Sequence, residues 1–205
     1  LVTRFLPNGQ HDTSFGTNGI TLVRPEPGQP RSAGIRLDSQ QRIVIGGYSQ
    51  SNANIFSFFA SRLTPNGLVD NAFGSAGSVL ASHPVANTGA PYTGGYVAIQ
   101  SDDQILIAGN IYFITPPEQS DRNASVVRFT ADGTLDTSYG ENGFFVKKIE
   151  SNAVTVRQLR LDENDASTLG LACESGCGFG IARLTPTGQL DTTFGDNNDG
   201  STFVR

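Results

Sequence analysis

The chain has 205 residues and a formal net charge of −5. A hydrophobic fraction of 37 % that includes thirteen Phe excludes a disordered chain, because disordered segments lack aromatic and β-branched residues. The pI near 4.9, without any basic cluster, argues against a nucleic-acid partner, since phosphate binding needs a positive surface. No apolar run approaches the roughly 20 residues of a membrane helix, so we expect no membrane insertion.

The sequence starts at Leu1, and its first residues lack the apolar core of a signal peptide. We therefore expect either that a leading segment was removed or that the chain is a piece of a longer one. Abundant Ser, Thr, Asn and Gly, with only two Lys, favours export. The interpretation is a secreted or cell-surface protein.

Internal repetition is the strongest signal in the chain. The pattern Arg-x4-Gly-x2-Asp-x2-[Phe/Tyr]-Gly occurs four times, roughly sixty residues apart. Its Arg and Asp residues form the pairs Arg4 and Asp12, Arg62 and Asp70, Arg128 and Asp136, and Arg183 and Asp191. The aromatic positions are Phe15, Phe73, Tyr139 and Phe194.

A second motif separates the copies. Apolar residues alternate in Ile35-Arg-Leu37 and Ile43-Val-Ile45, with turn residues between the two runs. In the first full repeat we expect strands at 34–38, 42–47, 55–63 and 67–73. Four short antiparallel strands in each repeat of this length indicate an all-β fold, the β-propeller.

The number of repeats does not complete a ring. Residues 1–30 supply only the second half of a repeat, and full repeats follow at about 31–77, 94–143 and 154–205. The chain therefore holds about three and a half four-stranded blades in a single region, whereas propellers have four to eight. We expect either an arc of a larger propeller or self-association with another chain that completes the ring.

The copy from Arg128 to Gly143, Arg-Phe-Thr-Ala-Asp-Gly-Thr-Leu-Asp-Thr-Ser-Tyr-Gly-Glu-Asn-Gly, resembles the delta-sixty repeat of large secreted and surface bacterial proteins. The resemblance covers nearly the whole chain and implies a bacterial propeller. It transfers no catalytic residue, because the family is defined by its structural repeat.

Residues that recur in every blade are expected to do the same structural task in each. We therefore interpret the repeated Arg and Asp residues as structural, with Asp capping a turn and Arg bridging to it or to the next blade. The aromatic residues are interpreted as core between blades. Asp38 and Asp162, at matching turns, are a weak candidate for a pair of catalytic carboxylates, because repetition gives both the same environment.

Several isolated features have structural and functional interpretations. His83 lacks a paired nucleophile, and we expect no catalytic role for it. The run Asp196-Asn-Asn-Asp199-Gly200 could bind calcium, the one cofactor considered, but it is out of register with known calcium loops, and a solvated turn is the alternative. We expect no other metal. Cys173 and Cys177 flank a hairpin tip and predict a disulfide in an oxidising compartment, with free thiols as the alternative.

Two long departures from the repeat are the best candidates for ligand binding, because binding residues concentrate on loops held by a rigid scaffold. They are segments 81–95 and 110–124. Tyr92 in the first, Tyr96 just beyond it, and Tyr112 and Phe113 in the second lie beside polar residues, which suits a carbohydrate or protein ligand. The predicted function is a non-catalytic binding or scaffold module. A polysaccharide hydrolase or lyase with its site in the propeller funnel, and a purely structural spacer, are the alternatives.

Overall fold

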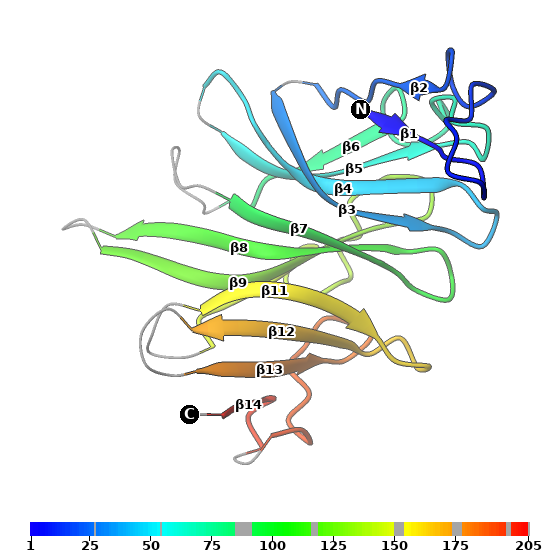
Figure 1. Cartoon of the computed structure of the whole chain (residues 1–205). Helices are drawn as coiled ribbons and strands as arrows, with labels where there is room; N and C mark the ends of the chain where they lie inside the picture. The colour runs from blue at the N-terminus through cyan, green and yellow to red at the C-terminus, as the bar shows by residue number, and fades with distance from the viewer. Residues whose placement is uncertain are drawn as a thin grey trace.

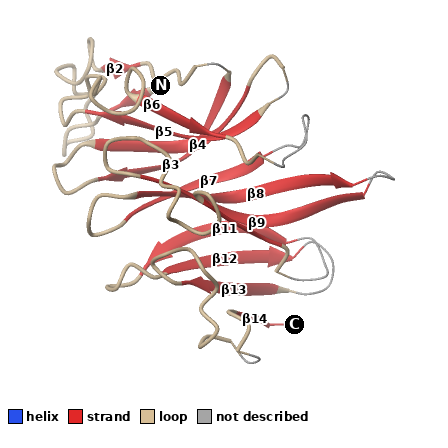
Figure 2. Cartoon of the chain, turned by 180° about the vertical axis from the view of Figure 1, so that it is seen from behind, coloured by secondary structure: helices blue, strands red, loops and turns tan. Residues whose placement is uncertain are grey.

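The computed structural model describes residues 1–26, 28–53, 55–84, 92–115, 119–149, 154–173, 178–195 and 198–204. These residues form strands and loops with no helix, as Figure 2 shows from behind. No segment among them is therefore a helix long and apolar enough to span a membrane.

The strands form three four-stranded antiparallel sheets and one two-stranded pair. The pair consists of β1 (Val2–Thr3) and β2 (Ile20–Thr21). The first sheet contains β3 (Gln29–Leu37), β4 (Ile43–Gln50), β5 (Phe56–Leu63) and β6 (Ser78–Ala81). The second contains β7 (Tyr92–Ile99), β8 (Ile105–Thr115), β9 (Gln119–Phe129) and β10 (Phe144–Lys147). The third contains β11 (Val154–Leu161), β12 (Ser167–Cys173), β13 (Phe179–Leu184) and β14 (Ser201–Val204).

Each sheet is an up-and-down meander in which consecutive strands are neighbours. We call the three sheets the first, second and third blade, and β1–β2 the half-blade. The half-blade corresponds to the last two strands of a full blade. Its motif begins at Arg4, next to β1, and is followed by β2, just as the motif of the first blade begins at Arg62 in β5 and is followed by β6. The described chain thus contains three and a half blades, as its repeats predict.

One predicted strand is wrong. The pattern places the fourth strand of the first blade at 67–73, but that segment forms turns, and the strand is Ser78–Ala81. The Asp70 amide donates to the Arg62 carbonyl at 3.0 Å, and the Phe73 amide donates to the Asp70 carbonyl at 3.0 Å. The first bond folds the segment back onto the end of β5, and the second closes a turn, so the strand that pairs with β5 begins only at Ser78.

The blades stack face to face with the core between them (Figure 1). One cluster joins Phe58 of the first blade to Ile107 of the second. Another joins Val126 of the second blade to Leu171 of the third, and a smaller one joins Phe15 to Phe59. Because each apolar cluster belongs to two sheets, no blade has a core of its own.

One close approach between blades is made at a glycine of the repeated turn. Gly133, in the turn between β9 and β10, has φ +86°, and a Cβ added there would lie 2.6 Å from the Gly74 amide nitrogen and 2.9 Å from the Phe73 ring. Gly9 is the equivalent glycine of the half-blade, with φ +82°, and a Cβ there would meet nothing within 4 Å.

This pair of glycines separates the cost of backbone conformation from the cost of packing. Gly9→Ala is expected to lower the free energy of unfolding by about 1 kcal/mol, the penalty of a left-handed conformation. Gly133→Ala adds overpacking against the first blade and should cost about 3 kcal/mol in total. Chemical denaturation of both variants checks this, and equal losses would contradict the packing argument.

Candidate functional site

The repeated Arg and Asp residues form one ion pair within each repeat. Arg4 Nε lies 2.7 Å from Asp12 Oδ2, Arg62 Nε lies 2.8 Å from Asp70 Oδ2, and Arg128 Nε lies 2.8 Å from Asp136 Oδ2. In the last repeat, Arg183 Nε lies 3.3 Å from Asp191 Oδ2. The pairing spans the turn that follows the third strand, and it holds the aromatic residue three positions after each Asp in place.

The other end of the guanidinium contacts the next blade. Arg4 Nη1 donates to the Pro65 carbonyl at 2.8 Å, and Arg128 Nη1 donates to the Pro186 carbonyl at 2.8 Å. Arg62 Nη1 makes the same contact with the Ala131 carbonyl at 2.5 Å. Each accepting carbonyl lies two residues before the turn glycine of the following repeat.

A backbone hydrogen bond between blades recurs beside each of these Arg contacts. Gly16, Gly74 and Gly140 follow the aromatic residues, and each donates its N–H at 2.8 Å to the carbonyl just before the next turn glycine. The acceptors are Asn66, Asp132 and Thr187. Every blade is thus joined to the next by one side-chain and one main-chain hydrogen bond at the same place.

The aromatic rings complete this contact. Phe15, Phe73 and Tyr139 are buried, and they pack against Gly67, Gly133 and Gly188 of the following repeat. The Arg Cζ atom of the same repeat lies over each ring, at 5.0, 4.5 and 4.7 Å from the centroid. We call this set of Arg, Asp, aromatic residue and the next repeat's glycine turn the inter-blade joint. These contacts give the repeated charges a structural task.

Hydrogen bonding favours the charged form of the Asp12, Asp136 and Asp191 carboxylates. The hydroxyl of Ser14 first, and then Arg4, hold the pKa of Asp12 below its ordinary value. Thr193 does the same to the pKa of Asp191 through its hydroxyl and its amide. Burial opposes the shift at Asp136, but hydrogen bonds from Ser138 and the charge of Arg128 together lower its pKa. The acids are held ionised rather than prepared to donate a proton.

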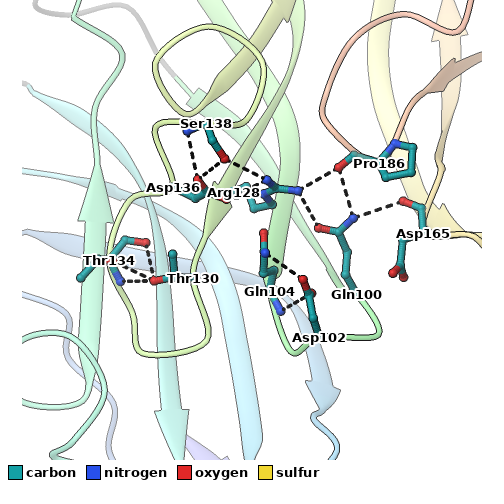
Figure 3. A network of polar contacts seen from close by, with 10 residues as sticks. All are labelled: Gln100, Asp102, Gln104, Arg128, Thr130, Thr134, Asp136, Ser138, Asp165 and Pro186. Carbon is teal, nitrogen blue, oxygen red and sulfur yellow. Dashed lines mark hydrogen bonds and ion pairs between the residues drawn. The ribbon is translucent and has the colours of Figure 1, made fainter.

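Figure 3 shows the joint between the second and third blades. Arg128 also donates to Gln100 Oε1 at 3.1 Å, and Gln100 Nε2 lies 3.3 Å from the Asp165 carbonyl. Gln100 lies where Asp38 and Asp162 lie in the other full blades. Its amide can both accept from Arg128 and donate to the third blade, which a carboxylate cannot do.

Asp38 and Asp162 do not form a pair of acids. Asp38 Oδ2 accepts from Arg42 Nε at 2.6 Å, and Asp162 Oδ2 accepts from Arg183 Nη2 at 3.0 Å. They belong to separate blades, and each has its own Arg. The geometry provides two salt-bridged turn residues.

The predicted binding residues lie on both faces of the second blade. Phe113 packs against the core shared with the first blade, whereas Tyr96 packs against the core shared with the third. Tyr112 adjoins Phe113 in β8, so its side chain points to the opposite face, the one that Tyr96 occupies. The side chain of Tyr92 lies outside the described residues. The structure therefore does not bring Phe113 and Tyr112 together.

The β8–β9 hairpin sets the second blade apart. Each of its strands has 11 residues, against 8 in β4 and β5, and it projects beyond the neighbouring blades (Figure 1). Tyr112 pairs with Arg122 across the strands, and Arg122 Cζ lies 4.9 Å from the Tyr112 ring centroid. Arg122 Nη1 also donates to Thr155 Oγ1 at 2.7 Å, which ties the hairpin to the third blade.

Asn110 has a role that the repeat pattern does not reveal. It is fully buried, its amide donates to the Val154 carbonyl at 3.1 Å, and its oxygen accepts from the Val156 amide at 2.9 Å. These bonds fix the first strand of the third blade against the second. The only signal in the sequence is a single Asn inside an apolar strand.

His83 lies between two aromatic rings. Its ring centroid is 5.6 Å from that of Phe113 and 5.2 Å from that of Phe144, both edge-on. Burial lowers the pKa of His83, and the charge of Glu141 opposes the shift. The neutral imidazole is the form that this apolar setting favours.

Two predictions fall partly outside the described residues. Cys173 is disulfide-bonded, but Cys177 lies outside them, so the pairing stays a prediction. Asp196 and Asn197 also lie outside, while Asp199 Oδ1 accepts from the Ser201 amide at 3.0 Å. In the part of the chain that the structure describes, no three His, Cys, Asp or Glu residues gather as a metal site would need.

Comparison with known proteins supports the identification of the sheets as propeller blades. Segments 42–73, 100–139 and 178–194 match the family model described as Domain of unknown function (DUF5122) beta-propeller. Each match ends on the aromatic residue of an inter-blade joint or, in the last blade, on its equivalent, Phe194. No curated protein matches the chain. The repeated four-stranded sheets and this match show that the chain is built of β-propeller blades.

One similar solved structure is a putative exo-beta-1,3-galactanase from Bifidobacterium bifidum s17. It is 13 % identical, with a TM-score of 0.45, and the match covers 98 % of this chain and 54 % of that one. The chain therefore spans about half the length of that protein.

The last two repeats offer a matched pair of arginines, Arg128 and Arg183. Arg128→Met removes a side chain that is 9 % exposed and strands the Asp136 carboxylate, so it should cost about 3 kcal/mol of unfolding free energy. Arg183→Met removes a side chain that is 37 % exposed and should cost about 1 kcal/mol or less. Chemical denaturation checks the ranking, and an equal loss would refute the structural role of the inter-blade joint.

The lowered pKa of His83 predicts that the stability of the protein depends on pH. Its folded-state pKa lies below the ordinary value of 6.5, so the unfolded chain binds a proton first as the pH falls. The free energy of unfolding should therefore decrease as the pH falls from about 7.5 to about 5.5, above the range in which carboxylates titrate. His83→Gln should flatten this slope. An unchanged slope in His83→Gln contradicts the assignment.

Proposed function

We propose that this chain is a non-catalytic β-propeller scaffold that binds its ligand at the β8–β9 hairpin. The observation that carries the proposal is the hairpin itself, whose strands extend past the length shared by the other blades and carry Tyr112 and Arg122. The joints hold the blade beneath it in a fixed position. Binding elements of this kind are typically loops or hairpins mounted on a rigid scaffold.

The chemistry of the hairpin suits a carbohydrate or a peptide. A half-buried Tyr ring offers an apolar face and a hydroxyl, and the neighbouring guanidinium offers hydrogen-bond donors. Because Arg122 also bonds to Thr155, the pair is held in one orientation before any ligand arrives. Such preorganisation reduces the entropic cost of binding.

We further propose that the repeats are of the delta-sixty type and that the protein is bacterial and either secreted or at the cell surface. The string from Arg128 to Gly143 supports the repeat type. The disulfide at Cys173 supports an oxidising compartment, because disulfides persist there and are rare in the cytosol.

Affinity gel electrophoresis with soluble polysaccharides, a β-glucan, a galactan and a mannan, tests the hairpin. At least one should retard the protein, and Tyr112→Ala should abolish the retardation because it removes the ring. Tyr48→Ala serves as the control, since Tyr48 is a half-buried aromatic residue of the first blade outside the hairpin.

The same samples are assayed for new reducing ends and for the unsaturated ends that a lyase creates. Retardation without chain cleavage agrees with a binding module. Cleavage favours the alternative, a polysaccharide hydrolase or lyase. Retardation that survives Tyr112→Ala places binding elsewhere, and no retardation contradicts a carbohydrate ligand for this hairpin.

A further inference from the structure

The third blade exposes a face that the other blades bury. Phe179 is 59 % exposed and Ile181 is 37 % exposed, both on β13. The strand registers align these two positions with Phe58, Ala60, Ala124 and Val126, all fully buried. Those four residues pack against a following blade. Within the described residues no strand covers the same face of the third blade.

This face also carries the donating half of an inter-blade joint. Phe194 occupies the aromatic position but is only half-buried, and no described glycine packs against it. In the earlier repeats the equivalent Arg reaches a following blade. Arg183 Nη2 instead donates to Asp162 Oδ2 of its own blade at 3.0 Å. We call this face the tail, consisting of Ile181, Arg183, Phe194 and Gly195.

The half-blade carries the receiving half of the same joint. The Gly9 amide donates to the Leu6 carbonyl at 2.8 Å, the same turn that Gly133 makes with Thr130 at 3.0 Å. The φ of Gly9 is +82°, against +86° for Gly133. The turn is therefore already in the conformation that accepts an aromatic ring, yet the space beside its Cα is open.

Apolar residues next to this turn are exposed as well. Phe5 is 63 % exposed and Ile20 is 41 % exposed. The register aligns them with Phe129 and Phe144 of the second blade, which are buried at 0 % and 2 % against the first blade. We call this surface the head, consisting of Phe5, Pro7, Asn8, Gly9 and Ile20. The N- and C-terminal ends of the chain lie at opposite ends of the stack (Figure 1).

We propose that the head of one copy of this chain docks on the tail of a second copy. The contact continues the interface that the chain already forms three times within itself. Phe194 packs on Gly9 of the second copy, Arg183 donates to its Pro7 carbonyl, and the Gly195 amide donates to its Asn8 carbonyl. The equivalent contacts inside the chain are those of Tyr139, Arg128 and Gly140 with the third blade.

The arrangement is head-to-tail, so it leaves a free head and a free tail unless a ring closes. Two copies hold six full blades and two half-blades, since each copy has three four-stranded sheets and one pair. That total lies in the range of four to eight blades found in closed propellers. The half-blade has only two strands. The docked contact therefore reproduces the part of the interface between blades that surrounds the glycine turn.

Sedimentation velocity over a dilution series measures the association of the unmodified chain. We expect a reversible complex of two copies, weakened by roughly tenfold or more in both variants, because the added methyl group of Gly9→Ala blocks the central contact and Phe194→Ala removes its ring. Ile55→Ala is the control, since Ile55 is an exposed apolar residue outside the head and the tail. Circular dichroism checks that each variant folds, and Arg183→Gln replaces Phe194→Ala if that variant does not.

Mixing the two weakened variants distinguishes head-to-tail docking from an interface in which both copies use the same surface. Gly9→Ala keeps an intact tail and Phe194→Ala keeps an intact head, so an equimolar mixture should regain association through one complete joint. A symmetric patch would give no such rescue. The proposal is overturned if the unmodified chain stays monomeric at all concentrations, if both variants associate normally, or if the mixture shows no gain.

Discussion

The contact on which the structure depends is that of an aromatic ring on a glycine of the next blade. At Gly67, Gly133 and Gly188 the ring or the neighbouring backbone lies closer than any Cβ allows. The spacing between blades is therefore set by the absence of one side chain. The ion pair of Arg and Asp positions the ring, and the spare guanidinium nitrogen binds the carbonyl beside the glycine. Each component depends on the others for its geometry.

Many of the few charged residues of this chain serve the contacts between blades. The repeated Arg and Asp residues are partly buried and neutralise one another, so their desolvation is offset within the joint. The same guanidinium lies over the aromatic ring and binds a carbonyl, which Lys could not do with a single ammonium group. The repeated charges are thus accounted for by the contacts between blades.

The sequence predicts the blades well because apolar alternation and turn glycines are local signals. Ile43 and Ile45 mark β4, and the spacing from Arg4 to Gly16 identifies the half-blade before any coordinates are known. The fourth strand is misplaced because Gly67 contacts Phe15 of the half-blade and Phe73 contacts Gly133 of the second blade, and no local pattern reports such contacts. Asn110 is missed for the same reason, since both of its hydrogen-bond partners in β11 lie more than forty positions away. The departure at 110–124 is expected to be a loop, but its described residues lie in β8 and β9, and strand alternation therefore divides Tyr112 from Phe113.

A joint of this kind has a direction. One side supplies a ring, a guanidinium and an amide, and the other supplies a bare Cα and two carbonyls, so neither side can bind a copy of itself. Any run of such blades consequently ends in two different surfaces that are complementary to each other. Exposed Phe5 and Phe179, at the two ends of this chain, are therefore the predictable result of a directional repeat. A symmetric repeat would instead leave two like surfaces, and its ends could pair only face to face.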